Sequence, residues 1–169
     1  MQNHFDLFQL ETGFELDLGQ LESAFREIQA RVHPDKFVNA GSTEQRIAMQ
    51  WATRANEAYQ TLKNPLKRAI YLCELNGVLL QAESNTAMPV EFLMQQLEWR
   101  EELEQAKHNP TVLLRLEKEV QQSHQEQIKK ITEQIKQANY HQAAQFIRQW
   151  MFLEKFGEEL DNSIIADHG

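Results

Sequence analysis

Cysteine is almost absent from this chain, because Cys73 is the only one among 169 residues. A single cysteine excludes an internal disulfide framework and any zinc site built from several thiolates. A chain of this length can bury a core without such staples. The N-terminus also has no basic segment followed by an apolar run, as an export signal would require. We therefore expect a protein of the reducing cytoplasm.

Positive charge and long apolar runs are scarce as well. Lys and Arg number 17 against 25 Asp and Glu, which makes the formal net charge −8. No basic cluster is dense enough to overcome repulsion by a phosphate backbone, so we expect no nucleic-acid partner. No segment approaches the roughly 20 apolar residues of a membrane-spanning helix, so we expect no membrane partner. Other proteins are the expected partners.

Strand-forming patterns are missing too. The chain has 6 Gly and 4 Pro, its commonest residues include Gln, Glu, Leu and Ala, and its β-branched residues never alternate along a run. The sequence therefore predicts an all-α fold.

Two amphipathic helices are predicted after a short helical turn near residues 5–10. Asp17 is a candidate N-cap for the first, with Gln20 as its capping-box partner, and Pro34 stops it. Ser42 and Gln45 offer a second capping box for a helix over about 42–64. Their lengths and the short loop predict an antiparallel hairpin. The expected buried stripes are Leu18, Leu21, Phe25, Ile28 and Val32 in the first helix, and Ile47, Trp51, Ala55, Tyr59 and Leu62 in the second.

The helix start and stop signals in the rest of the sequence predict a second domain. Asn64-Pro65 opens a short helix that Gly77 can close. We expect a first domain over 1–76, a connection over 77–88 and a three-helix bundle over 89–169. The bundle helices are expected to start at Pro89, after Asn109 and near Tyr140.

The loop between the first two long helices reads Val-His-Pro-Asp-Lys-Phe over 32–37. A His-Pro-Asp tripeptide between two antiparallel helices resembles the J domain, which stimulates ATP hydrolysis by DnaK-type chaperones. The resemblance implies that His33, Pro34 and Asp35 bind the ATPase chaperone. Proline also limits the conformational entropy that such a recognition point loses on docking. Arg26, Arg31 and Lys36 would supply positive charge toward an acidic groove on the ATPase chaperone.

Other readings of the tripeptide stay open at this point. His33 and Asp35 are a possible metal or acid/base pair, although two groups do not make a zinc site and no nucleophile pattern accompanies them. Alternatively, Pro34 only ends a helix and its neighbours are incidental loop residues.

The resemblance extends to two further segments, Gln-Thr-Leu-Lys-Asn-Pro-Leu-Lys-Arg-Ala over 60–69 and Phe-Leu-Met-Gln-Gln-Leu-Glu-Trp-Arg-Glu-Glu-Leu over 92–103. Together with the loop they look like the HscB co-chaperone family, J-domain proteins of iron–sulfur cluster assembly. No zinc-binding cysteine pairs precede the J domain, so a bacterial type fits best. The family implies an N-terminal J domain and a C-terminal three-helix bundle that binds the iron–sulfur scaffold IscU.

The first bundle helix carries two apolar sets, and one stripe cannot hide both. The expected core stripe is Phe92, Gln96, Trp99, Leu103 and Ala106. Leu93, Met94 and Leu97 lie on a different side of the same helix. In the third bundle helix the expected core stripe is Ala143, Ile147 and Trp150, and Phe152 lies on the opposite side. Such apolar groups rimmed by charge indicate a protein interface. The alternative is that neighbouring helices or the first domain bury them.

The family resemblance puts IscU contacts on this surface. The matching residues are Leu93, Met94, Leu97, Glu98, Arg100, Glu101 and Phe152. Gln105 stands where many relatives have an acid, which leaves a polar contact at the edge of the surface undetermined.

These observations predict a monomeric co-chaperone, not an enzyme, that stimulates an HscA-type ATPase chaperone and delivers IscU to it. No cofactor and no metal are expected, since no Gly-rich phosphate loop or metal-ligand cluster is evident. The rival functions are a J-domain protein with another client, an enzyme with a cryptic site, and an inert helical scaffold.

Overall fold

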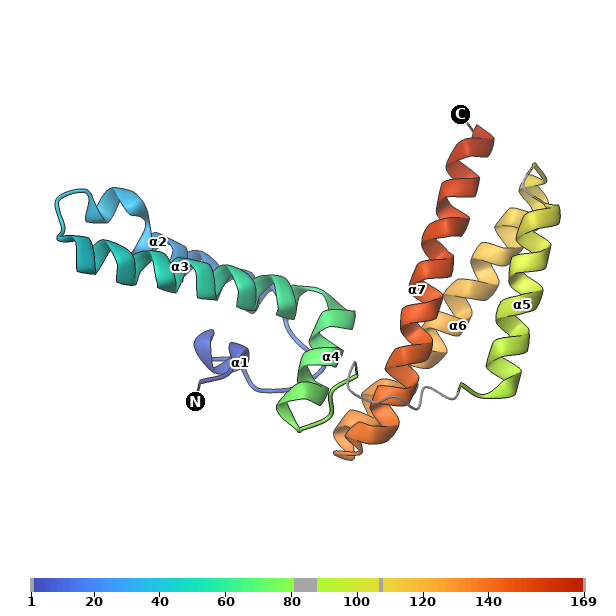
Figure 1. Cartoon of the computed structure of the whole chain (residues 1–169), viewed down its shortest axis with the longest axis horizontal. Coiled ribbons are helices and arrows are strands. Elements are labelled where there is room, and N and C mark those ends of the chain that lie inside the picture. The colour runs from blue at the N-terminus through green and yellow to red at the C-terminus, as the bar shows by residue number, and fades with distance from the viewer. Residues whose placement is uncertain (1, 81–87, 107, 169) are drawn as a thin grey trace. The chain divides into compact units, whose positions relative to one another are not determined.

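The computed structural model describes residues 2–80, 88–106 and 108–168 (Figure 1). Every regular element in these ranges is helical, which confirms the all-α prediction. The elements are α1 (His4–Leu7), α2 (Leu18–Val32), the 3₁₀ helix η1 (Pro34–Phe37), α3 (Ser42–Lys63), α4 (Pro65–Leu75), α5 (Val90–Gln105), α6 (Pro110–Lys136) and α7 (Tyr140–His168).

The chain forms two compact units, Met1–Leu72 and Cys73–Gly169, which divide within α4. Most of the expected connection at 77–88, residues 81–87, lies outside the described residues. Before it, Gly77 takes a φ of +80°. In this left-handed conformation its N–H bonds to Glu74 O at 3.0 Å and the N–H of Val78 bonds to Cys73 O at 2.9 Å. Glycine adopts this conformation without a steric penalty, so it ends α4 as predicted.

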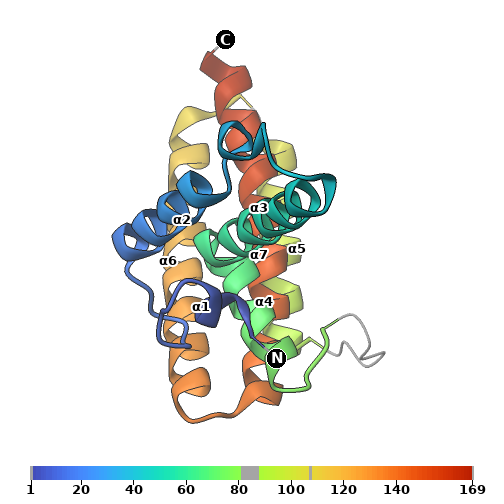
Figure 2. The same ribbon diagram turned by 90° about the vertical axis from the view of Figure 1, so that its left-hand side faces the viewer.

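In the first unit, α2 and α3 form an antiparallel hairpin, as the two views show (Figures 1 and 2). Asp17 is the N-cap of α2 as predicted, because its Oδ1 accepts the N–H groups of Gly19 and Gln20 at 2.9 and 3.2 Å. Phe25 of α2 stacks on Tyr59 of α3, with ring centroids 4.1 Å apart and planes 4° apart. The stack joins the middle of α2 to the C-terminal part of α3.

The predicted stripe of α3 is partly wrong. Ile47 and Trp51 are exposed, Trp51 to 40%, and the guanidinium of Arg54 lies 5.5 Å from the Trp51 ring centroid. Leu18, at the start of α2, is exposed as well. Ala55 and Leu62 of the predicted stripe are buried, and the other buried residues of α3 are Ala48 and Ala58. The buried face of α3 is thus made mostly of small alanine side chains, and the larger Ile47 and Trp51 lie outside it.

Arg68 of α4 connects α4 to two other segments of the first unit. Its Nε donates to Phe14 O at 2.8 Å and its Nη1 donates to Leu62 O at 2.6 Å. The guanidinium also lies 5.2 Å from the centroid of the Phe14 ring. Burial lowers the pKa of Arg68, and these two carbonyl acceptors compensate its lost hydration.

In the second unit, α6 and α7 form a long antiparallel pair, and α5 lies along one half of it (Figure 1). The predicted stripe of α5 is confirmed, because Gln96, Trp99, Leu103 and Ala106 are buried and Phe92 is half-buried. The core where all three helices meet consists of Trp99, Leu103, Leu113, Leu116, Val120, Leu153, Phe156 and Leu160. In the described part of the chain, no helix has the length and apolarity that crossing a bilayer demands.

The stacked pair of His4 and Tyr71 makes stability in the first unit depend on pH. Their ring centroids are 4.3 Å apart, and the backbone N–H of His4 donates to the Tyr71 hydroxyl at 2.9 Å. Burial, as the largest cause, and Arg54 lower the pKa of His4 from 6.5, whereas Glu57 opposes them. As the pH falls below 6.5, the unfolded histidine therefore binds protons more readily than the folded one, and stability falls.

We expect His4→Phe, which keeps an aromatic ring on Tyr71 but cannot titrate, to lose less stability than wild type between pH 8 and pH 5. Urea unfolding of both chains at the two pH values measures the difference. Equal losses of unfolding free energy would show that His4 does not contribute to the pH dependence.

Candidate functional site

The His-Pro-Asp turn lies where the hairpin reverses. α2 ends at Val32, and His33 has a φ of −58° and a ψ of 135°. A residue before proline avoids the helical region, so Pro34 ends α2 by acting on His33. Pro34 itself is the first residue of η1, where its missing N–H costs nothing. The sequence thereby places the tripeptide outside both long helices.

Local hydrogen bonds hold the tripeptide. The Nδ1 atom of His33 accepts the N–H of Asp35 at 3.2 Å, and Lys36 N donates to His33 O at 3.0 Å. Since Nδ1 is an acceptor here, the proton of the neutral imidazole is on Nε2. The side chains of His33 and Asp35 are 57% and 87% exposed, with Nδ1 and Oδ2 3.5 Å apart. The turn is thus an ordered polar group open to a partner.

The three predicted cations are not equivalent. Arg26 pairs with Glu22, and Arg31 pairs with Glu27, each at 2.6 Å along α2. Five residues of helix separate the two arginines by roughly 140° around the axis, so they do not share one face. Lys36 lies within η1 beside the tripeptide and is exposed. Intrahelical acids therefore offset much of the positive charge on α2.

Gln45 has a different role from the predicted one. The N-cap of α3 is Gly41 without a side-chain hydrogen bond, so the predicted capping box of Ser42 and Gln45 is wrong. The Nε2 group of Gln45 instead donates to Phe37 O at 2.9 Å and to Ala40 O at 3.2 Å. The side chain thus joins α3 to the loop that follows the tripeptide.

The second predicted surface is an exposed apolar face on α5. Leu93, Met94 and Leu97 are all exposed, Leu97 to 60%, so neighbouring helices of the unit do not bury them. Val90, also exposed, lies on the same face, one helical turn before Leu93 and Met94. The sequence prediction omitted Val90, although its spacing of three, four and seven residues from the others is a readable signal.

Phe152 of α7 joins α5 at the edge of this face. It is 45% exposed, and its ring meets that of Phe92 edge-on, with centroids 6.5 Å apart. The sequence places Phe152 opposite the buried stripe of its own helix but does not predict its contact with Phe92. Periodicity along one helix cannot reveal this contact, because it requires the packing of α5 against α7.

Charged residues surround the apolar face unequally. Glu98 and Glu101 are exposed on α5, and so is Gln105 in its last turn. Arg100 bonds to Glu159 of α7 at 2.9 Å, and its guanidinium lies 5.7 Å from the Phe156 ring centroid. Arg100 therefore links α5 to α7, whereas the two glutamates present negative charge.

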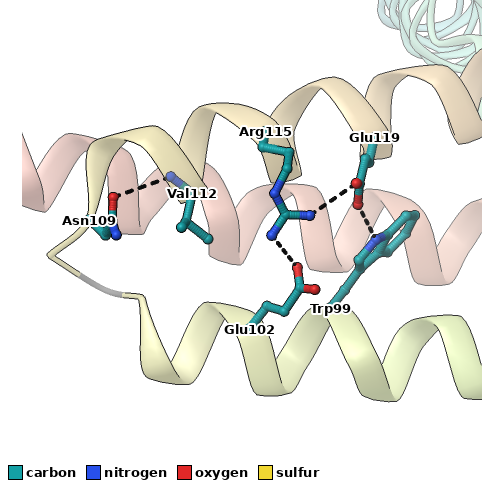
Figure 3. Close-up of polar contacts among 6 residues, drawn as sticks. All are labelled: Trp99, Glu102, Asn109, Val112, Arg115 and Glu119. Carbon is teal, nitrogen blue, oxygen red and sulfur yellow. Dashed lines mark hydrogen bonds and ion pairs between the residues drawn. The ribbon is translucent and has the colours of Figure 1, made fainter.

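A polar network joins the opposite side of α5 to α6. Figure 3 shows Arg115 of α6 reaching Glu102 of α5 at 2.8 Å and Glu119 of its own helix at 3.0 Å. The indole Nε1 of Trp99 donates to Glu119 at 3.0 Å. The hydrogen bond to Glu102 is the largest cause raising the pKa of Arg115, followed by that to Glu119. The network and the buried Trp99 fix which residues of α5 face outward.

In the described ranges, no three His, Cys, Asp or Glu side chains come together as candidate ligands of a metal ion. The two candidate sites are an exposed polar turn and an exposed apolar face. Exposed apolar patches rimmed by charge are typical of protein interfaces.

A helical hairpin that presents a His-Pro-Asp turn defines a J-domain protein, and comparisons with known proteins identify its family. Residues 88–161 match the family model described as the HSCB C-terminal oligomerisation domain. A Co-chaperone protein HscB homolog of Bordetella pertussis is 50% identical over 159 residues, 94% of either chain. The chain belongs to the HscB co-chaperone family, J-domain proteins of iron–sulfur cluster assembly.

Solved structures agree with this assignment. Chaperone HscB from Vibrio cholerae has a TM-score of 0.86 and 36% identity over 98% of this chain and 99% of that one. Human co-chaperone protein HscB has a TM-score of 0.90 at 24% identity, over 98% of this chain and 84% of the human one, which supports the fold.

The polar network around Arg115 predicts a salt-dependent stability. We expect Arg115→Met, which keeps an unbranched apolar side chain but removes the guanidinium and its charge, to lower the midpoint of thermal unfolding at low salt. The deficit should shrink at about 0.5 M salt, because salt screens exposed ion pairs. Lys118→Met serves as a control on the same helix. A deficit independent of salt would show that lost packing, rather than lost ion pairs, causes the change.

Proposed function

We propose that this co-chaperone binds an HscA-type ATPase chaperone through the His33-Pro34-Asp35 turn and delivers the scaffold IscU, held on the α5 face, to it. The observation that carries the proposal is the presence of two exposed, ordered recognition surfaces, one on each compact unit of a single chain. ATP hydrolysis then takes place on the partner. We expect the chain to act in the cytoplasm as a monomer, without cofactor or metal.

The order of the turn supports its role in docking. The ring of Pro34 restricts the backbone, and the bond from Asp35 N to His33 Nδ1 orients the imidazole. A partner that binds this turn does not have to order it, so little conformational entropy is lost on association. Lys36 completes the proposed chaperone surface, with Arg26 and Arg31 as weaker contributors because their own helix supplies acids.

The α5 face supports the scaffold contact through its chemistry. Removing its apolar side chains from water on binding is favourable by about 25 cal/mol per Å² of apolar surface buried. Met94, with its flexible thioether, can adapt to an irregular partner surface. Glu98 and Glu101 at its edge favour a partner with basic residues beside an apolar patch. The proposed scaffold surface is Leu93, Met94, Leu97, Glu98, Arg100, Glu101 and Phe152, with Val90 added.

Carrying both surfaces on one chain supplies the mechanism of delivery. Once the turn has bound the chaperone, the linked scaffold is present at a high effective concentration near the substrate site of that chaperone. The chain thus accelerates complex formation without a catalytic group of its own.

The steady-state ATPase rate of the HscA-type chaperone tests the proposal. Wild type is expected to stimulate hydrolysis synergistically with IscU, whereas His33→Gln is expected to remove the stimulation, because glutamine cannot reproduce the oriented imidazole. His108→Gln, which changes an exposed histidine between α5 and α6, is the matched control and should behave as wild type. If wild type gives no stimulation, the proposed function is wrong.

The scaffold surface is tested by calorimetric titration with IscU. We expect Leu97→Ala to weaken binding about 5- to 10-fold, the loss of roughly 1 kcal/mol of apolar burial. The Leu93/Leu97/Phe152 triple alanine variant should weaken it at least about 100-fold and lose only the IscU-dependent part of the ATPase stimulation.

Leu114→Ala is the control, since Leu114 is 55% exposed but lies on α6 outside the proposed surface. Circular dichroism shows whether the triple variant, which loses the ring contact between Phe92 and Phe152, remains folded. Unchanged affinity in a folded triple variant would refute the scaffold surface and leave a J-domain protein with another client.

A further inference from the structure

Gln45 connects the loop after the His-Pro-Asp turn to the body of the hairpin. Its side-chain Nε2 donates to two carbonyl groups, Phe37 O at 2.9 Å and Ala40 O at 3.2 Å. Its backbone N–H makes the first hydrogen bond of α3 itself, to the N-cap carbonyl Gly41 O at 3.0 Å. The attachment of the loop to α3 that is specific to glutamine is therefore the pair of side-chain hydrogen bonds.

Backbone hydrogen bonds lie at both ends of η1, the segment between the tripeptide and this attachment. Phe37 is the last residue of η1, and its carbonyl also accepts the N–H of Ala40 at 3.0 Å. At the other end of η1, His33 O accepts the N–H of Lys36 at 3.0 Å. η1 is thus a short segment with His33 as its N-cap and with Gln45 bonded to the carbonyl of its last residue.

The first end of η1 is joined to α2 through His33, which is not helical, so η1 does not continue the axis of α2. A 3₁₀ turn of four residues has few internal hydrogen bonds of its own. Its direction is therefore set by its packing against α2 and α3. The hydrogen bonds from Gln45 add a polar attachment to α3 at the far end of η1.

We propose that Gln45 is a positioning residue that orients the His33-Pro34-Asp35 turn for docking on the ATPase chaperone. This inference rests on the proposed function and deepens it. Gln45 itself touches neither the tripeptide side chains nor, by this proposal, the partner. It acts by restricting the loop before association, which reduces the entropy that docking must remove.

A merely structural role predicts a different pattern of effects. The Gln45 side chain is exposed, and water can hydrate the two carbonyl groups when it is removed. Loss of its hydrogen bonds should therefore shift the midpoint of thermal unfolding by no more than about 3 °C. Loss of orientation should instead raise the concentration of co-chaperone that gives half-maximal stimulation, while the stimulation at saturation stays unchanged.

The test compares two substitutions that differ in one property. Gln45→Met has the same side-chain length but no donor, and Gln45→Lys keeps a donor that can reach both carbonyl groups. We expect Gln45→Met to raise the half-maximal concentration about 5-fold and Gln45→Lys to return it to within about 2-fold of wild type. The assays are run at about 0.3 M salt, so that the added charge of lysine is screened.

A matched control and a second readout complete the design. Gln50→Met changes an exposed glutamine of α3 outside this loop and should match wild type in both assays. Amide hydrogen exchange should be faster at Ala40 in Gln45→Met than in wild type, because the loop opens locally, while exchange in the core of the hairpin is unchanged.

The possible outcomes separate the inference from the proposed function. If wild type stimulates the chaperone and Gln45→Met has the same half-maximal concentration, the inference is overturned and the proposed function stands. Gln45→Lys as impaired as Gln45→Met would also overturn it, because the donor would then not matter. If wild type fails to stimulate, the proposed function is overturned, and the inference with it.

Discussion

The structure of the first unit depends on the steric effect of Pro34 on the residue before it. Because His33 cannot stay helical, α2 ends at Val32 and the chain reverses into α3. The same constraint puts His33 at the start of η1, where its imidazole accepts the N–H of Asp35. Helix termination, chain reversal and exposure of the tripeptide therefore have one cause. Without the proline, this steric exclusion of His33 from the helical region would be lost.

The structure of the second unit depends on a different constraint, because α5 can bury only one stripe of side chains. Trp99 and Leu103 take the buried side, and the network of Arg115, Glu102 and Glu119 holds that side to α6. The remaining apolar residues of α5 have no place in the core and face outward. The same packing that stabilises the bundle thus creates the surface proposed for IscU. In both units the proposed binding surfaces consist mainly of exposed side chains that are not part of the core.

Periodicity was sufficient to predict elements whose burial depends on one helix alone, and it failed where two helices meet. The stripe of α5 and the Asp17 cap are local features, and both are confirmed. The buried face of α3 is not a local feature, because α1, α2 and η1 all pack against this helix. For the same reason the contact of Phe152 with α5 and the bond of Gln45 to the loop could not be read from spacing. The tripeptide itself was found because its residues are contiguous.

The most direct test of delivery asks whether the two surfaces must be on the same chain. An equimolar mixture of His33→Gln and the Leu93/Leu97/Phe152 triple alanine variant contains both surfaces intact, but on separate molecules. If tethering brings IscU to the chaperone, the mixture should fail to restore the IscU-dependent synergy in ATPase rate that wild type gives at the same concentration. Full synergy from the mixture would contradict delivery by a single chain and would indicate that the two surfaces act independently.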